Sequence, residues 1–356
     1  MPIKKPPNMS KLDMSASDLD PRDTTYSLTD SGTFSKDDFT FNANGMSQSP
    51  FGQHEGSSIL SQLQFVKQLG SGASSVVKLM YHPQNRWLLA LKTLAAMEDA
   101  GTRQQVVNEL KVLCNVRCDH LVTLYDAFFL EGVIYLALEY MNAGSLEGVL
   151  RAAPGKRIPE TVLGQIVLQM LHGLVYLHKE KHQLHRDLKP ANILLSTQGE
   201  VKLSDFGISR QLESTLGSAG TFVGTAHYMS PERIVGDGYS FAADVWCIGL
   251  IALECATGTY PYAASVSGGN ANYFELVKAI VEGPLPTEDP SLQPLLEAGH
   301  VSLEFLDFVR HCLNKQQQAR PTALQLMEHP FVQRASAAAQ GNQQLAAWLQ
   351  SVGVGM

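Results

Sequence analysis

The stretch that decides the fold is His185-Arg186-Asp187-Leu188-Lys189-Pro190-Ala191-Asn192, and residues 193–204 separate it from Asp205-Phe206-Gly207. It supplies a carboxylate and an amide close together in sequence, and Asp205 supplies a second carboxylate. Phosphoryl transfer needs such groups, because it depends on neutralising charge and on placing the acceptor in line. In this interpretation Asp187 accepts the proton of the attacking hydroxyl, Asn192 binds a metal ion and Asp205 holds Mg²⁺ on the nucleotide phosphates.

Toward the N-terminus, a glycine-rich turn separates two predicted strands, Phe65–Leu69 and Ser75–Met80. The turn, Gly70-Ser71-Gly72-Ala73-Ser74-Ser75, departs from G-x-G-x-x-G because Ser75 stands in the third glycine position. Taken alone, such a turn is more often a plain hairpin than a phosphate site. Val77 follows it at the position that would cover an adenine ring.

A lysine, Lys92, follows Ala90 on the next predicted strand, 88–93. A buried lysine needs a partner, and Glu109 on the predicted helix 103–114 is the natural one. The pair would hold Lys92 against the α- and β-phosphates of ATP. Each motif alone is consistent with polar residues that cap helices and turns, whereas the ordered set predicts a phosphoryl-transfer site.

The periodicity of the chain changes after the predicted strand 134–139. Apolar residues recur at helical spacing over 162–178, and 245–255 is nearly continuously apolar, which predicts a buried helix. The predicted class is therefore α+β and bilobal, with a small β-rich lobe containing one key helix and a larger, mainly helical lobe. We expect residues 1–62 to be a disordered regulatory and docking segment, 63–332 the folded domain, and 333–356 a short tail with a possible helix at 345–349.

Composition excludes several classes of protein. The 356 residues are 44% hydrophobic and 17% charged, as in a globular protein, and a net charge of -7 argues against a general nucleic-acid binder. No uninterrupted apolar run approaches the ~18 residues that span a bilayer, and no secretory signal is expected. The five cysteines show no metal-ligand spacing and are expected to be reduced thiols.

The order of these motifs, with Ser230-Pro231-Glu232 after them, resembles the eukaryotic protein kinases over about residues 65–331. The resemblance implies that Glu232 pairs with Arg320 and that Asp244 braces the catalytic loop. It implies Lys189 as a further catalytic residue, Leu138 as gatekeeper and residues 139–141 as the hinge. The residues implied to bind ATP are Leu69, Gly70, Ser71, Gly72, Ala73, Ser74, Ser75, Val76, Val77, Ala90, Lys92, Glu109, Leu138, Glu139, Met141 and Leu194.

The segment from Ser204 to Thr225, with residues 228–233 and Glu254-Cys255-Ala256-Thr257-Gly258, resembles the MAP kinase kinases. Residues 70–77, and a stretch from 19–23 through 29–33, resemble a plant-type subgroup of that family. Lys189 and Thr225 fit the serine/threonine type. The resemblance implies Mg-ATP as cofactor, phosphorylation of both Thr and Tyr in the activation loop of a MAP kinase, and activation by an upstream MAP kinase kinase kinase. Two departures are Ser204, where animal members often carry Cys, and the absence here of the nuclear-transport-factor-like domain found in that plant subgroup.

Regulatory sites follow from the same resemblance. Thr215 and Thr221 match the S/T-x5-S/T spacing of plant activation sites, with Ser214 and Ser218 as nearby competitors. Phosphate there would order the segment against Arg186. Lys4-Lys5 followed by Leu12-x-Met14 fits a MAP kinase docking peptide, although such patterns also arise by chance in disordered tails.

Two other functions stay open from the sequence. A MAP kinase kinase kinase, or another related serine/threonine kinase, would share the core motifs. A pseudokinase scaffold would have to lack Lys92, Asp187, Asn192 or Asp205, all of which are present. We expect a cytoplasmic protein, with entry into the nucleus left open.

Overall fold

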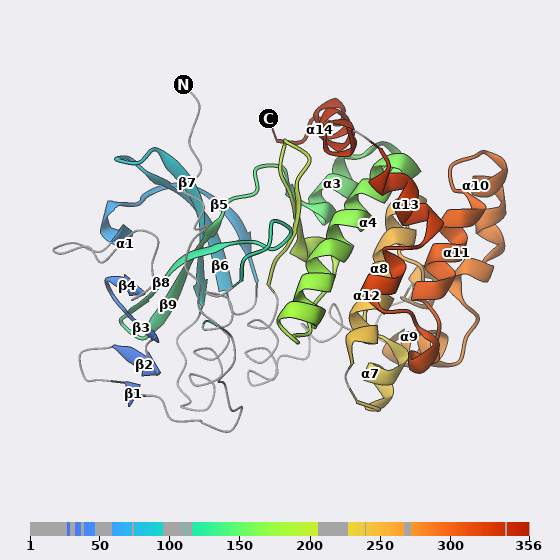
Figure 1. Cartoon of the computed structure of the whole chain (residues 1–356), viewed down its shortest axis with the longest axis horizontal. Coiled ribbons are helices and arrows are strands. Elements are labelled where there is room, and N and C mark those ends of the chain that lie inside the picture. The colour runs from blue at the N-terminus through green and yellow to red at the C-terminus, as the bar shows by residue number, and fades with distance from the viewer. Residues whose placement is uncertain are drawn as a thin grey trace. The chain divides into compact units, whose positions relative to one another are not determined.

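The computed structural model describes residues 27–28, 33–36, 39–46, 59–72, 75–94, 110, 116–205, 227–238, 240–266, 272–338 and 340–355 (Figure 1). The chain forms two compact units. The first, called the small lobe here, contains the described residues up to Arg117 and Val122–Tyr140. The second, called the large lobe, contains Cys118–Leu121, the described residues from Met141 to 205 and those from 227 onward.

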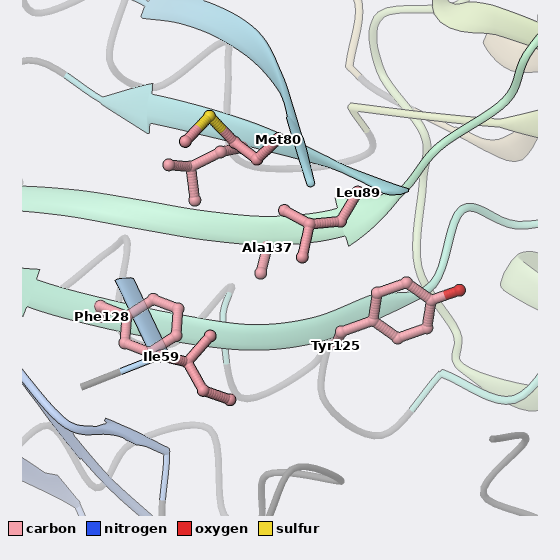
Figure 2. Packing of buried hydrophobic residues seen from close by; sticks show 7 residues of the cluster. Ile59, Met80, Leu89, Tyr125, Phe128 and Ala137 are labelled. Atoms are coloured by element: carbon pink, nitrogen blue, oxygen red, sulfur yellow. The ribbon is translucent and has the colours of Figure 1, made fainter. Parts of the chain in front are cut away.

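An antiparallel five-stranded sheet is the centre of the small lobe. Its strands, in spatial order, are β5 (Gln64–Ser71), β6 (Ser75–His82), β7 (Trp87–Leu94), β9 (Val133–Glu139) and β8 (Leu124–Leu130). The strands expected at 65–69, 75–80, 88–93 and 134–139 are all present. One core cluster of buried residues on this sheet comprises Ile59, Met80, Leu89, Leu91, Tyr125, Phe128 and Ala137 (Figure 2).

The first residue of that core, Ile59, precedes the domain boundary expected at 63. It begins the short helix α1 (Ile59–Gln62) and is only 1% exposed. Leu60 and Leu63 pack against the same cluster. The packed small lobe therefore begins before residue 63, because the apolar residues of α1 complete the sheet's core.

A second sheet forms within the segment that was expected to be disordered. It has the order β1 (Ser27–Leu28), β2 (Phe34–Lys36), β3 (Phe39–Asn42) and β4 (Gly45–Met46), all antiparallel. Both β3 and β4 contact β8. The Met46 N–H donates to Asp126 Oδ1 at 2.8 Å, and the Asp126 side chain is almost fully buried. Composition did not reveal this order, because the anchoring carboxylate lies far away in the sequence.

We expect Gly45→Ala to loosen this attachment. Gly45 has φ +112°, and an added Cβ would lie 2.8 Å from Asp126 Oδ2, so the substitution combines backbone strain with a steric clash. Strain of this kind costs about 1–3 kcal/mol. Gly132→Ala is the matched control, since Gly132 has φ +80° but open space around a Cβ.

Thermal unfolding and the hydrogen exchange of residues 39–46 measure the difference in stability between the Gly45→Ala and Gly132→Ala variants. Gly45→Ala should unfold at a lower temperature than Gly132→Ala and should exchange faster at the Met46 N–H. Equal losses in the two variants would show that the Asp126 contact adds nothing beyond strain.

The large lobe is mainly helical, as expected (Figure 1). Its small sheet is β10 (Gly144–Ser145), β11 (Ile193–Leu195) and β12 (Val201–Leu203). Its α-helices are α3 (Leu146–Ala152), α4 (Glu160–Val175), α7 (Pro231–Val235), α8 (Phe241–Thr257), α9 (Asn272–Val281), α10 (Gln293–Glu297), α11 (Leu303–Cys312), α12 (Ala323–Leu326), α13 (Pro330–Ser336) and α14 (Gly341–Ser351).

The two helices predicted to be apolar form the centre of the large lobe. Helix α8 buries nearly all its residues, and α4 continues into a π-helical turn, η2 (Tyr176–Glu180). Within the described residues, Glu160–Glu180 is the one helix long and apolar enough to cross a bilayer, but 78% of its apolar window is buried inside the fold. It is therefore a core helix, and α4 and α8 contact each other directly.

Candidate active site

Three of the predicted catalytic side chains meet around Asp187 in the large lobe. The Asn192 Nδ2 donates to both the main-chain O and Oδ2 of Asp187, each at 2.7 Å. The Lys189 Nζ lies 2.8 Å from the same Oδ2. The Asp187 carboxylate is 9% exposed, so these bonds fix its orientation in a largely enclosed position.

The catalytic loop is held from α8 by one buried carboxylate, as the resemblance implied. Asp244 is 1% exposed and accepts from the main-chain N–H groups of His185 (2.8 Å) and Arg186 (3.0 Å). Its Oδ2 also lies 2.9 Å from His178 Nε2. These bonds compensate the burial of the charge and fix the backbone immediately before Asp187.

No role was predicted for His178. It lies in the π-helical turn that follows α4 and is 7% exposed. The available signal was a polar residue at the end of an otherwise apolar helical run. Such a residue needs a buried partner.

Two residues of this site have a strained backbone. Arg186 has φ +72° and Asp205 has φ +59°, in the left-handed region that residues with a Cβ rarely adopt. Arg233 Nη1 donates to the main-chain O of Arg186 at 3.1 Å, which helps to hold that conformation. Strain of this kind persists where the surroundings determine the backbone, and it concentrates at functional sites.

The two predicted metal ligands stand at the open end of the β11–β12 hairpin. Asn192 ends the turn η3 (Pro190–Asn192) just before β11, and Asp205 follows β12 after Ser204. Both the N–H and the Oγ of Ser204 donate to Asn192 O, at 2.9 and 3.1 Å. The hairpin therefore sets the spacing between the two ligands.

The donor set fits Mg²⁺. The Nδ2 of Asn192 is engaged by Asp187, so the amide oxygen is the atom that this side chain offers to a cation. With the carboxylate of Asp205 it supplies hard oxygen ligands, which Mg²⁺ prefers together with water and substrate phosphates.

The predicted nucleotide residues of the small lobe lie on three adjacent strands. Lys92 on β7 is 5% exposed and pairs in register with Val77 on β6 and Leu136 on β9. Ala90 is the register partner of Leu138 on β9. The strands place Val77, Ala90, Lys92 and Leu138 within one continuous piece of sheet.

The other nucleotide residues are divided between the two lobes. Leu69, Gly70 and Ser71 lie on β5, Ser75 and Val76 on β6, and Gly72 in the turn between them, where its N–H donates to Ser75 O at 2.8 Å. Glu139 ends β9 in the small lobe. Met141 and Leu194, on β11, belong to the large lobe.

The expected Glu232–Arg320 pair is present. Arg320 Nη1 and Nη2 donate to the two Glu232 carboxylate oxygens at 2.8 and 3.2 Å. Burial alone would raise the pKa of Glu232, but the hydrogen bonds and charge of Arg320 outweigh it and hold that pKa below its usual value. Since Glu232 follows Ser230 and Pro231, the pair ties the segment after the activation loop to the large lobe.

An aromatic cluster supports the same segment and was not foreseen as a unit. Tyr228 donates to Glu254 Oε2 at 2.5 Å, and Tyr260 donates to the main-chain O of His227. Burial raises the pKa of the Glu254 carboxyl and, more strongly, that of the Tyr228 hydroxyl. The family resemblance drew attention to residues 228–233 and 254–258, but not to Tyr260.

Some predicted residues lie outside the described part of the structure. They are Ala73, Ser74, Glu109, Phe206, Gly207, Ser214, Thr215, Ser218, Thr221, Thr225 and the docking segment at residues 4–14.

Comparison with known proteins agrees with this geometry. The protein kinase domain family matches residues 63–332. A catalytic loop braced by a buried carboxylate, a hairpin carrying the two predicted metal ligands and a buried strand lysine fit this family, and the chain is an ATP-dependent protein kinase.

Similarity to individual relatives shows which family of protein kinases the chain belongs to. The chain is 42% identical to mitogen-activated protein kinase kinase 2 of Arabidopsis thaliana, over 87% of this chain and 85% of that protein. It is 39% identical to mitogen-activated protein kinase kinase SIPKK of Nicotiana tabacum, over 86% and 85%. It is 38% identical to dual specificity mitogen-activated protein kinase kinase dSOR1 of Drosophila melanogaster, over 77% and 71%. The chain belongs to the MAP kinase kinase family.

Proposed function

We propose that the protein phosphorylates both the Thr and the Tyr of a MAP kinase activation loop, using Mg-ATP. The observation that carries the proposal is the arrangement of Lys189 and Asn192 around the Asp187 carboxylate. Similarity to relatives named MAP kinase kinases, one of them named as dual specificity, supports the choice of acceptor.

In the proposed mechanism Asp187 accepts the proton of the incoming hydroxyl and orients its oxygen toward the γ-phosphate. Lys189, 2.8 Å from Asp187 Oδ2, is placed to balance negative charge on the transferred group. Asn192 and Asp205 would hold Mg²⁺, which would neutralise charge on the nucleotide phosphates. Lys92 holds the α- and β-phosphates, and the strand residues around it bind the adenosine.

Activation by an upstream MAP kinase kinase kinase is part of the proposal, with Thr215 and Thr221 as the accepting residues. A phosphate carries about two negative charges at neutral pH and pairs readily with arginine. Arg186, beside the catalytic aspartate, is the proposed partner. A cytoplasmic location is proposed as well, with entry into the nucleus left open.

The experiment is transfer of labelled phosphate from ATP to a panel of kinase-dead MAP kinases. The protein carries Thr215→Asp and Thr221→Asp to mimic activation, and the same protein with the additional substitution Asp187→Ala is the negative control, or blank. Labelling of both Thr and Tyr in one acceptor, absent with the blank, supports the proposal. Transfer to generic serine/threonine substrates alone would show that the protein is a kinase but would contradict the proposal that a MAP kinase is its acceptor.

A further inference from the structure

The β11–β12 hairpin, whose open end carries Asn192 and Asp205, also has a closed end. There Ser196 N donates to Glu200 O at 2.9 Å, and Gly199 N donates to Ser196 O at 3.0 Å. The three residues of β11 separate this turn from Asn192, and the three residues of β12 with Ser204 separate it from Asp205. Because the two strands are short and hydrogen-bonded to each other, a shift of the turn would also shift the open end of the hairpin.

Helix α14 and the turn after it contact this closed end at two points. Gly199 has φ +81°, and a Cβ there would overlap the main-chain O of Asn342, in the first turn of α14. Gly355 lies against Thr197 in the same way, since an added Cβ would overlap the Thr197 methyl group. The main chain at the start of α14 and the main chain just after its end thus both pack directly on the hairpin turn.

One buried side chain of α4 joins the hairpin to α14. Gln169 is 4% exposed. Its Nε2 donates to Gly199 O at 3.0 Å and to Asn342 Oδ1 at 3.3 Å, while its Oε1 accepts from Val201 N at 2.9 Å. A single side-chain amide therefore forms hydrogen bonds with the turn, with the first residue of β12 and with the start of α14.

Helix α14 itself is anchored to the large lobe by apolar residues. Leu345 and Leu349, one turn apart, are both fully buried, and α14 packs against α4. Gly341 lies against Gln165, whose Nε2 donates to Ala335 O at 2.7 Å. The expectation of a helix at 345–349 that packs back on the domain is thus confirmed.

We infer that α14 positions the metal-binding hairpin of the kinase, with Gln169 and Asn342 as positioning residues that touch neither nucleotide nor acceptor. The helix holds the closed end of the hairpin, so that its open end presents Asn192 and Asp205 at a fixed spacing. The inference rests on the proposed roles of these two residues as Mg²⁺ ligands. Residues that orient metal ligands typically change metal affinity about 10- to 100-fold when mutated.

The test compares Leu345→Ala/Leu349→Ala with a surface control on the same helix, Gln343→Ala/Gln350→Ala, in the full chain. Both control positions are exposed. The readout is the Mg²⁺ concentration that gives half-maximal phosphoryl transfer, measured beside the KM for the protein acceptor. We expect about a tenfold rise in that Mg²⁺ concentration for the leucine variant, with an unchanged acceptor KM and faster hydrogen exchange at the Val201 N–H. The control should behave as wild type.

An unchanged Mg²⁺ dependence in a folded leucine variant would overturn the inference, as would equal effects in variant and control. Should the leucine variant fail to fold, Asn342→Ala decides the matter. This exposed residue loses only its bond to Gln169, and the inference requires a rise in the Mg²⁺ requirement without a change in melting temperature. Asp205→Asn, measured separately, tests the metal assignment, so that its failure is distinguishable from failure of the positioning role.

Discussion

Asp187→Asn is expected to lower kcat about 10²- to 10⁴-fold, the range that general-base groups supply. The amide has the same shape as the carboxylate and keeps an oxygen that can accept from Asn192 Nδ2. It cannot take a proton from the acceptor hydroxyl, and it removes the charge that faces Lys189 at 2.8 Å. The loss is therefore expected in the chemical step rather than in the fold.

Steady-state transfer, single-turnover rates and melting temperature separate these effects. The KM for ATP and the melting temperature should stay close to those of the wild type, because Asp244 still holds the loop through the N–H groups of His185 and Arg186. Asp237→Asn, an exposed position in the same lobe, is the control. An Asp187→Asn enzyme that keeps more than about a tenth of wild-type kcat would contradict the assignment of the base.

Arg320→Ala is expected to lower the free energy of unfolding by about 3–5 kcal/mol, because it leaves a buried carboxylate without its partner. The Arg320 side chain is fully buried and also donates to the main-chain O of Ala242 and Asn314. Arg334→Ala is the control, since its pairs with Glu160 and Glu304 are exposed and such pairs contribute about 1 kcal/mol or less.

Denaturant unfolding of Arg320→Ala, Glu232→Gln and the double variant measures the coupling. The double variant should lose less than the sum of the two single losses, because Glu232→Gln removes the stranded charge. The pKa of Glu232 is lowered in the folded state, so its ionisation stabilises the fold above the ordinary carboxylate range. That advantage over Glu232→Gln should fade as the pH falls through the lowered pKa. A coupling free energy near zero would exclude a supporting role for the pair.

The sequence predicted four strands of the five-stranded sheet and the two central apolar helices, because each of these depends on a strong local pattern, whereas β8 was not predicted. The bracing contacts of Asp244 and Glu232 were expected from the family resemblance. It did not predict the β1–β4 sheet, since the partner of Met46 is Asp126, whose role arises only in the folded chain. The role of Gln169 was not predicted either, because in the sequence it is only a polar residue on an apolar helix. Its three bonding partners lie far from it in the sequence, two in the β11–β12 hairpin and one at the start of α14.

The attachment of the N-terminal sheet has a practical consequence for choosing fragments. The family match begins at residue 63, yet Ile59 is 1% exposed in the small-lobe core, and Met46 donates to the buried Asp126. A recombinant fragment cut at the family boundary would lose both contacts and expose apolar surface on the sheet. Limited proteolysis of the intact chain should accordingly leave a resistant core whose first residue precedes Gly45.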